Sequence, residues 1–190
     1  MSGNGNGLGY GTGYKYSGGS LTEAELVPHE IADDKNPLYS GDTIEVHYVY
    51  SSNANATLEN SLGSCLTNWK GEEQPFLRVE TQVYVLVNDE NALDFTKLNH
   101  VTEVNGHNQA EHIPSNTGTP VQYEGSTTGP GYNEKASPYQ VSWSVRPEVA
   151  KVNIATVEDW FHHNDFDEHY AHAVRDLVVN PNLLSEMGTH

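Results

Sequence analysis

The stretches GDTIEVHYVY, at residues 41–50, and LRVETQVYVLV, at residues 77–87, decide the fold of this chain. After a turn at residues 39–42, apolar and polar residues alternate over residues 43–50 of the first stretch. In the second, every other residue from Val79 to Val87 is Val or Thr, so each stretch is typical of a β-strand. Residues 140–145 repeat the alternation and predict a third strand. The side chains expected on one face of the second and third strands are Val79, Thr81, Val83, Val85 and Val87, and then Val141, Trp143 and Val145.

Only short helices are expected beside these strands. A capping-box pattern at Ser20 predicts a helix of at most two turns over residues 21–26, and Thr156 is a candidate cap for a later one. A further helix is predicted over residues 170–179, whereas residues 99–138 are rich in Gly, Pro, Thr and Asn and indicate loops. We therefore expect a mainly β (α+β) fold in which short peripheral helices flank a central, largely antiparallel sheet.

The domain organisation follows from composition. Residues 1–20 alternate Gly with Asn, Tyr and Thr, and such a segment cannot bury enough apolar surface to offset the entropy lost on ordering. We interpret it as a glycine-rich tail or loop. Residues 21–190 are the length of one domain with a core of its own.

Charge and cysteine content exclude several classes of function. The 190 residues carry 26 acids against 9 bases, a formal charge of -17, which disfavours nucleic acid and anionic membrane surfaces as partners. No stretch approaches the length of about 20 apolar residues that a membrane span needs, and the first residues of the sequence lack the basic and then apolar order of a signal peptide. A single cysteine excludes zinc sites of the paired CxxC type, so any metal site must rest on the ten histidines and on carboxylates.

Glu45 and His47 form the first candidate for chemistry. Two residues apart on a strand, their side chains leave the same face. A carboxylate beside an imidazole fixes the tautomer of a metal-binding histidine and points its lone pair at the ion. An exposed polar face on an edge strand gives the same pattern, so the residues alone leave both interpretations open.

The second candidate is the turn YEGSTTGP at residues 123–130. The hydroxyl groups of Thr127 and Thr128 can orient a small nucleophile such as a bound hydroxide. By composition alone, the same segment is an ordinary loop.

Ordered blocks of sequence suggest a family. From about Leu21 to Ser185, their order resembles the delta-class carbonic anhydrases. The blocks are GDTIEVHYVYSS (41–52), GSCL (63–66), LRVETQVYVLVND (77–89), TGTPVQYEGSTTGPGY (117–132), SPYQVSWSVRP (137–147) and HAVRDLVVNPNLLS (172–185).

The resemblance implies a zinc enzyme that interconverts CO2 and bicarbonate, in which three neutral histidines hold the metal and the metal lowers the pKa of its bound water to about 7. It assigns His47 as a zinc ligand and Glu45 as the partner that supports it. Thr128 or Thr127 takes the role of the threonine that accepts the proton of the bound hydroxide. The strand with Val141 and Trp143 resembles the wall of the CO2 pocket in the alpha class, whose architecture is then expected here. Substitution of zinc by cobalt or cadmium stays open.

The sequence departs from the family pattern in its zinc ligands. The family places its first two zinc ligands in a His-x-His strand upstream of the Glu-x-His strand, and this sequence has no His-x-His. Three interpretations follow: the chain is N-terminally incomplete, it is a carbonic-anhydrase-like binding or scaffold domain without zinc, or His107 and His112 rebuild the site. The first is our working hypothesis, and it carries an expectation of export to the periplasm or the outside.

Overall fold

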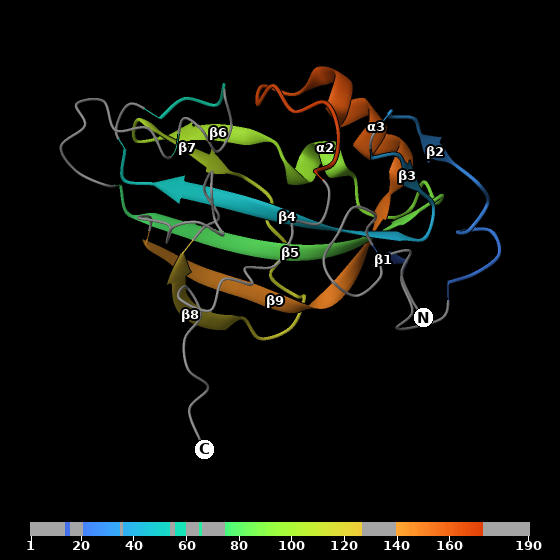
Figure 1. Cartoon of the computed structure of the whole chain (residues 1–190), viewed down its shortest axis with the longest axis horizontal. Coiled ribbons are helices and arrows are strands. Elements are labelled where there is room, and N and C mark those ends of the chain that lie inside the picture. Colours follow the sequence, from blue (N-terminus) through green and yellow to red (C-terminus); the bar gives the residue numbers. More distant parts are fainter. Residues whose placement is uncertain are drawn as a thin grey trace, which may run out of the picture.

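The strands and helices of the computed structural model are shown in Figure 1. The residues that the structure describes are 14–15, 21–34, 36–53, 56–59, 65, 75–126 and 140–172. In chain order the elements are β1 (Tyr14–Lys15), β2 (Glu30–Ile31), β3 (Leu38–Tyr39), β4 (Asp42–Ser51), β5 (Leu77–Val87), α2 (Phe95–Leu98), β6 (Val101–Val104), β7 (His107–Ala110), β8 (Val121–Ser126), β9 (Gln140–Asn153) and α3 (Ile154–His163).

A five-stranded sheet with the order β1-β4-β5-β9-β8 forms the centre of the molecule. Its neighbouring strands pair antiparallel except β5 and β9, which run parallel. Parallel neighbours need a long crossover, and here α2, the β6–β7 hairpin and β8 lie between the two strands in sequence. The mainly β fold with a largely antiparallel sheet, expected from the sequence, is confirmed.

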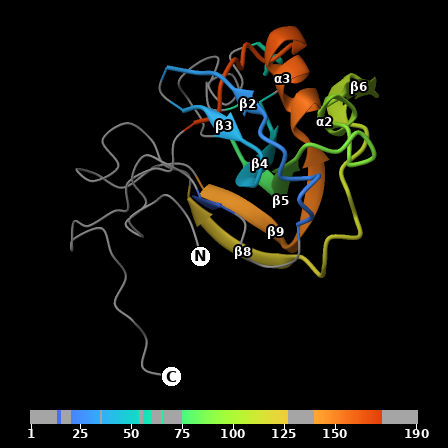
Figure 2. The same ribbon diagram turned by 90° about the vertical axis from the view of Figure 1, so that its right-hand side faces the viewer.

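Helices α2 and α3 cover one face of this sheet (Figure 2). Alternate residues of β4, β5 and β9 supply the apolar side chains on that face, and the two helices add theirs. Phe95 of α2 packs edge to face on both Tyr84 of β5 and Trp160 of α3, with ring centroids 6.4 and 5.3 Å apart. The buried residues of this core are Ile31, Tyr84, Leu86, Phe95, Leu98, Val152, Ile154, Val157 and Phe161.

The expected strands at residues 43–50 and 77–87 are present with nearly the expected bounds, but the third continues well beyond Val145 to Asn153. Its pairing with β5 shifts between Thr81 and Val83, where β9 runs through Pro147. Proline has no N–H to give to the ladder, so it is tolerated at such an irregularity.

The expectation of loops over residues 99–138 is wrong in part. Residues 101–110 form the β6–β7 hairpin, and residues 121–126 form β8 at the edge of the sheet. Asn105 and Gly106 turn the hairpin with φ angles of 53° and 79°. Asn-Gly is the preferred pair for a two-residue hairpin turn because both residues tolerate positive φ.

Two helix expectations also need correction. The capping box lies at Thr22 and Glu25, whose side chains bond each other's backbone N–H, and residues 23–26 form a turn instead of a helix. Helix α3 is capped by Asn153, and the Thr156 hydroxyl instead bonds the Asn153 carbonyl and accepts from Phe95 N. Residues 173–179 of the helix expected at 170–179 lie outside the described residues.

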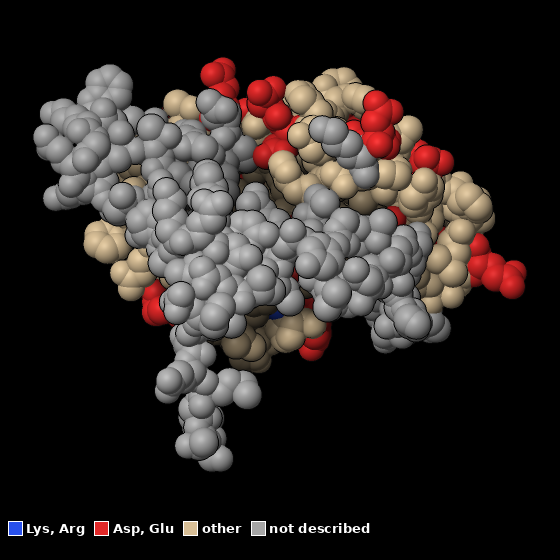
Figure 3. All heavy atoms as spheres, in the orientation of Figure 1, with Lys and Arg blue, Asp and Glu red and all other residues tan. Residues whose placement is uncertain are grey.

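The acidic composition is visible at the surface. Asp and Glu side chains line much of the rim of the face shown in Figure 3, where Lys and Arg are nearly absent among the described residues. Within the described part of the chain, no helix is long and apolar enough to cross a membrane.

Candidate functional site

Glu45 and His47 lie together on the sheet face that is turned away from the helices. Their neighbours Ile44 and Val46 point into the helix-side core, so the alternation of β4 places Glu45 and His47 on the other side. His47 Nε2 lies 3.3 Å from Glu45 Oε2, and both side chains are partly exposed to solvent. The sequence-based placement of the pair on one face of a strand agrees with this geometry.

The contact fixes which nitrogen of His47 can bind a ligand. When Nε2–H donates to the carboxylate, the lone pair of the neutral imidazole is on Nδ1. The hydrogen bond from His47 also holds the pKa of Glu45 below its usual range, against the opposing effect of partial burial. Glu45 is therefore an anion at neutral pH and suited to orient the ring.

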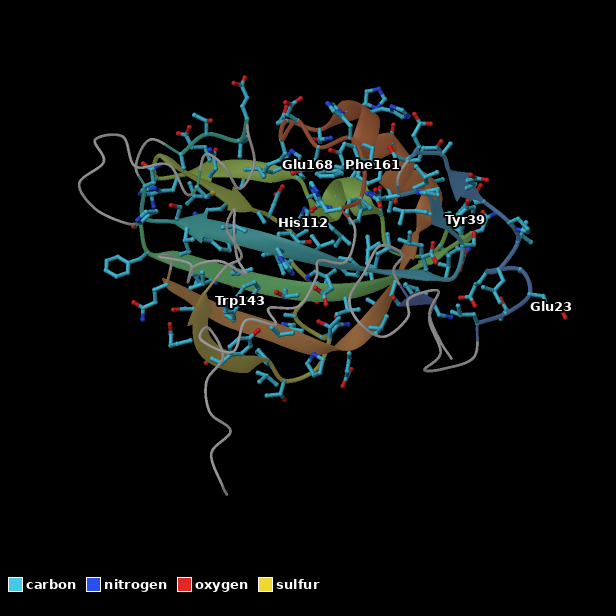
Figure 4. The ribbon with its side chains drawn as sticks, in the orientation of Figure 1. Glu23, Tyr39, His112, Trp143, Phe161 and Glu168 are labelled. Atoms are coloured by element: carbon cyan, nitrogen blue, oxygen red, sulfur yellow. The ribbon has the colours of Figure 1, made fainter. Side chains whose placement is uncertain are left out.

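Trp143 forms an aromatic wall beside this pair. The His47 and Trp143 rings meet edge to face with centroids 5.4 Å apart, and Tyr123 of β8 stacks on the other side of the indole at 6.1 Å. Figure 4 shows Trp143 over the strands, away from Phe161 on the helix side. Val141, two residues before Trp143, is fully buried. Val141 and Trp143 belong to a second apolar cluster, whose other members are Leu77, Val79, Val49 and Cys65.

Thr81 is a neighbour of His47 that the sequence patterns did not mark as a candidate. It lies on β5 directly opposite His47 and shares its face of the sheet. Thr81 is 4 % exposed, and within the described residues its Oγ1 atom has no hydrogen-bond partner. A signal was present in the sequence, because Thr81 is the one polar residue among the alternate positions 79, 81, 83, 85 and 87, where the others are Val.

The family model described as delta carbonic anhydrase matches residues 1–156, which include the Glu45–His47 strand and the Trp143 wall. This chain belongs to the delta carbonic anhydrase family. Searches of curated proteins and of solved structures give no match.

Carbonic anhydrases use a zinc ion, and the side chains of this chain either provide its ligands or do not. Zinc of the catalytic kind needs three protein ligands, as in the three-histidine site of carbonic anhydrase. Nine of the ten histidines are described, all except His190, and within the described ranges no three His, Cys, Asp or Glu side chains form a group that could hold a metal. The described residues therefore do not fit a three-histidine zinc ion.

The histidines proposed to rebuild the site do not join His47 in a ligand group. His112 lies 3.6 Å from the Glu111 carboxylate, between Nε2 and Oε2, and His107 begins β7 with an exposed side chain. This interpretation therefore has no support among the described residues. Thr127 and Thr128 lie outside the described residues, directly after β8 ends at Ser126.

Proposed function

We propose that this chain serves the reaction of its family, the reversible hydration of CO2 to bicarbonate, on the sheet face that carries His47. In this proposal His47 is a zinc ligand through Nδ1, and Glu45 orients its ring. Trp143 and Val141 form the apolar wall for CO2, and the hydroxyl of Thr127 or Thr128 faces the reacting oxygen. The observation that carries the proposal is the Glu45–His47 hydrogen bond beside an aromatic wall, in a chain of this family.

The proposal assigns the remaining zinc ligands to groups outside the described residues. His47 is one ligand where the chemistry needs three, and the other described histidines do not gather around it. A single imidazole binds zinc weakly. We therefore expect the chain by itself to hold far less than one equivalent of zinc after dialysis, with cobalt and cadmium bound no better.

A second function is favoured by the same gap in the ligand set. In this alternative, the chain is a carbonic-anhydrase-like domain that binds a partner without zinc. Val121 and Tyr123 support it, because both are at least half exposed on the edge strand β8. Exposed apolar side chains on an edge strand are suited to contact another molecule.

Chemical rescue distinguishes the two functions. The 190-residue chain is mixed with zinc and excess free imidazole, which supplies the missing type of ligand, and CO2 hydration is followed by stopped flow. We expect hydration above that of the same mixture without protein, and loss of this excess in His47→Ala. His100→Ala is the matched control, because His100 also pairs with a carboxylate, that of Glu111, and lies away from β4, in the connection between α2 and β6.

Two results of the rescue experiment would contradict the proposal. Equal hydration by the wild type and His47→Ala contradicts the assignment of His47 and leaves the partner-binding function. Tight, stoichiometric zinc in the dialysed chain, with sulfonamide-sensitive turnover, contradicts the incomplete ligand set.

A further inference from the structure

Thr81 is a buried polar residue in an apolar part of the sheet. On its own face it lies between His47 of β4 and Val145 of β9. The row next to it contains Val79, with Trp143 beside it on β9. A hydroxyl that is removed from water without a hydrogen-bond partner destabilises the folded state, so its presence needs a reason.

Gln82, the buried polar residue next to Thr81, differs from it in having hydrogen-bond partners among the residues that the structure describes. Gln82, on the opposite face of β5, donates from Nε2 to the Pro114 carbonyl at 2.8 Å and accepts from the Thr117 hydroxyl at 2.7 Å. Gln82 thus has a protein partner for each end of its amide, whereas the Thr81 Oγ1 has none among the described residues.

The sheet is irregular at the same place. The pairing of β5 with β9 shifts immediately after Thr81. Irregularities of this kind occur often next to active sites, where they change the direction of side chains. The Thr81 hydroxyl, which has no partner in the described part of the chain, the His47 imidazole and the Trp143 indole therefore meet where the regular ladder is interrupted.

The charge and shape of the surroundings of Thr81 limit the kinds of ligand that can bind there. The nearest charged side chain on this face of β4 is the carboxylate of Glu45, which disfavours an anion beside it. A small neutral molecule that has apolar surface and an oxygen acceptor matches both the apolar side chains of Val79 and Trp143 and the hydroxyl of Thr81. CO2 has these properties.

We propose that Thr81 Oγ1 donates a hydrogen bond to an oxygen of CO2 held beside the contact between the His47 and Trp143 rings, which makes Thr81 a substrate-binding residue. This inference rests on the proposed function, because it takes CO2 as the substrate of this face. It adds a polar contact to a wall that is otherwise apolar.

The test measures CO2 binding to the metal-free 190-residue chain by NMR, using the Thr81 methyl and His47 ring signals. CO2 is added at acidic pH, where it predominates, and bicarbonate at alkaline pH, each against nitrogen-equilibrated buffer of equal ionic strength. The variants are Thr81→Val, which keeps the shape and removes the hydroxyl, Thr81→Ser, which keeps the hydroxyl, and Thr102→Val on β6 as a remote control.

We expect CO2 to shift both signals in the wild type, in Thr102→Val and, for His47, in Thr81→Ser. In Thr81→Val the apparent affinity read from His47 falls about three- to tenfold, as for the loss of one hydrogen bond. An unchanged affinity in Thr81→Val contradicts the inference, as does a wild type in which neither signal moves. A response to bicarbonate alone contradicts the assignment of CO2 as the ligand. Because no metal or turnover is involved, failure here is distinguishable from failure of the zinc and imidazole rescue.

Discussion

The imidazole of His47 packs edge to face on the indole of Trp143, with ring centroids 5.4 Å apart, although their strands β4 and β9 are not neighbours in the sheet. The strand between them, β5, contributes Val79 and Thr81 to the same face. The contact therefore joins a candidate metal ligand to a candidate substrate wall across a third strand.

Replacing Trp143 by Ala is expected to destabilise the chain by about 2 kcal/mol. A fully buried Trp costs about 3–5 kcal/mol when truncated to Ala, and Trp143 is only partly buried. Urea denaturation followed by circular dichroism measures the change. Trp143→Phe keeps an aromatic ring against Tyr123 and is expected to recover at least half of the loss. A change below about 0.5 kcal/mol in Trp143→Ala would show that the wall does not contribute to folding.

Replacing Glu45 by Ala is expected to weaken zinc binding at His47 by about 10- to 100-fold, the usual result of losing a carboxylate that orients a ligating histidine. Zinc titration followed through the His47 ring signals measures the affinity. Glu111→Ala, which removes the carboxylate partner of His100, is the matched control. An affinity equal to that of the wild type in Glu45→Ala would refute the orienting role.

Replacing Thr81 by Val is expected to stabilise the ligand-free chain by about 1 kcal/mol, because it removes a buried hydroxyl that has no partner among the described residues and keeps the β-branched shape. The free energy of unfolding in urea tests this, with Thr102→Val as the control. A stabilised variant that binds CO2 less well shows that the hydroxyl is retained for a ligand. Destabilisation by Thr81→Val would mean that the hydroxyl has a structural partner.

His169 is expected to titrate with a pKa above the ordinary value of about 6.5. The Phe161 carbonyl accepts a hydrogen bond from Nδ1 and the Asp167 carboxylate lies 3.1 Å from Nε2, and both raise the pKa of His169. Because the folded-state pKa is raised, the stabilising contribution is complete below about pH 6.5 and is lost as the pH rises through the folded-state pKa.

NMR titration of the His169 ring measures this pKa. Asp167→Asn is expected to lower it only in part, because the Phe161 carbonyl remains. Asn suits position 167, where φ is 60°, since Asn tolerates the left-handed region. Asp165→Asn is the control. A wild-type midpoint at or below about 6.5 would contradict the expectation.

Local patterns predicted β4 and β5 well. Alternation with period two is set within each strand, and it placed Glu45 and His47 on one face without knowledge of the rest of the fold. The Asn105–Gly106 turn was equally local, but it lay in a Gly-, Thr- and Asn-rich run that indicated loops as a whole. The composition of the run therefore hides the hairpin signal of this pair.

The neighbours of His47 could not be predicted in the same way. Thr81 and Trp143 reach it through strand register and through a parallel pairing of β5 with β9, which depend on contacts far apart in sequence. The absence of a His-x-His pair was visible in the sequence. Only the structure could show that the other described histidines do not gather around His47.

The most direct test of the central claim, that His47 is a metal ligand of a carbonic anhydrase site, is a zinc titration of the ¹⁵N-labelled chain that follows both ring nitrogens of His47. The account predicts that zinc shifts the Nδ1 signal selectively, while Nε2 keeps the character of an N–H donor to Glu45. His47 signals that stay unmoved at excess zinc, or a shift at Nε2 in place of Nδ1, would contradict it.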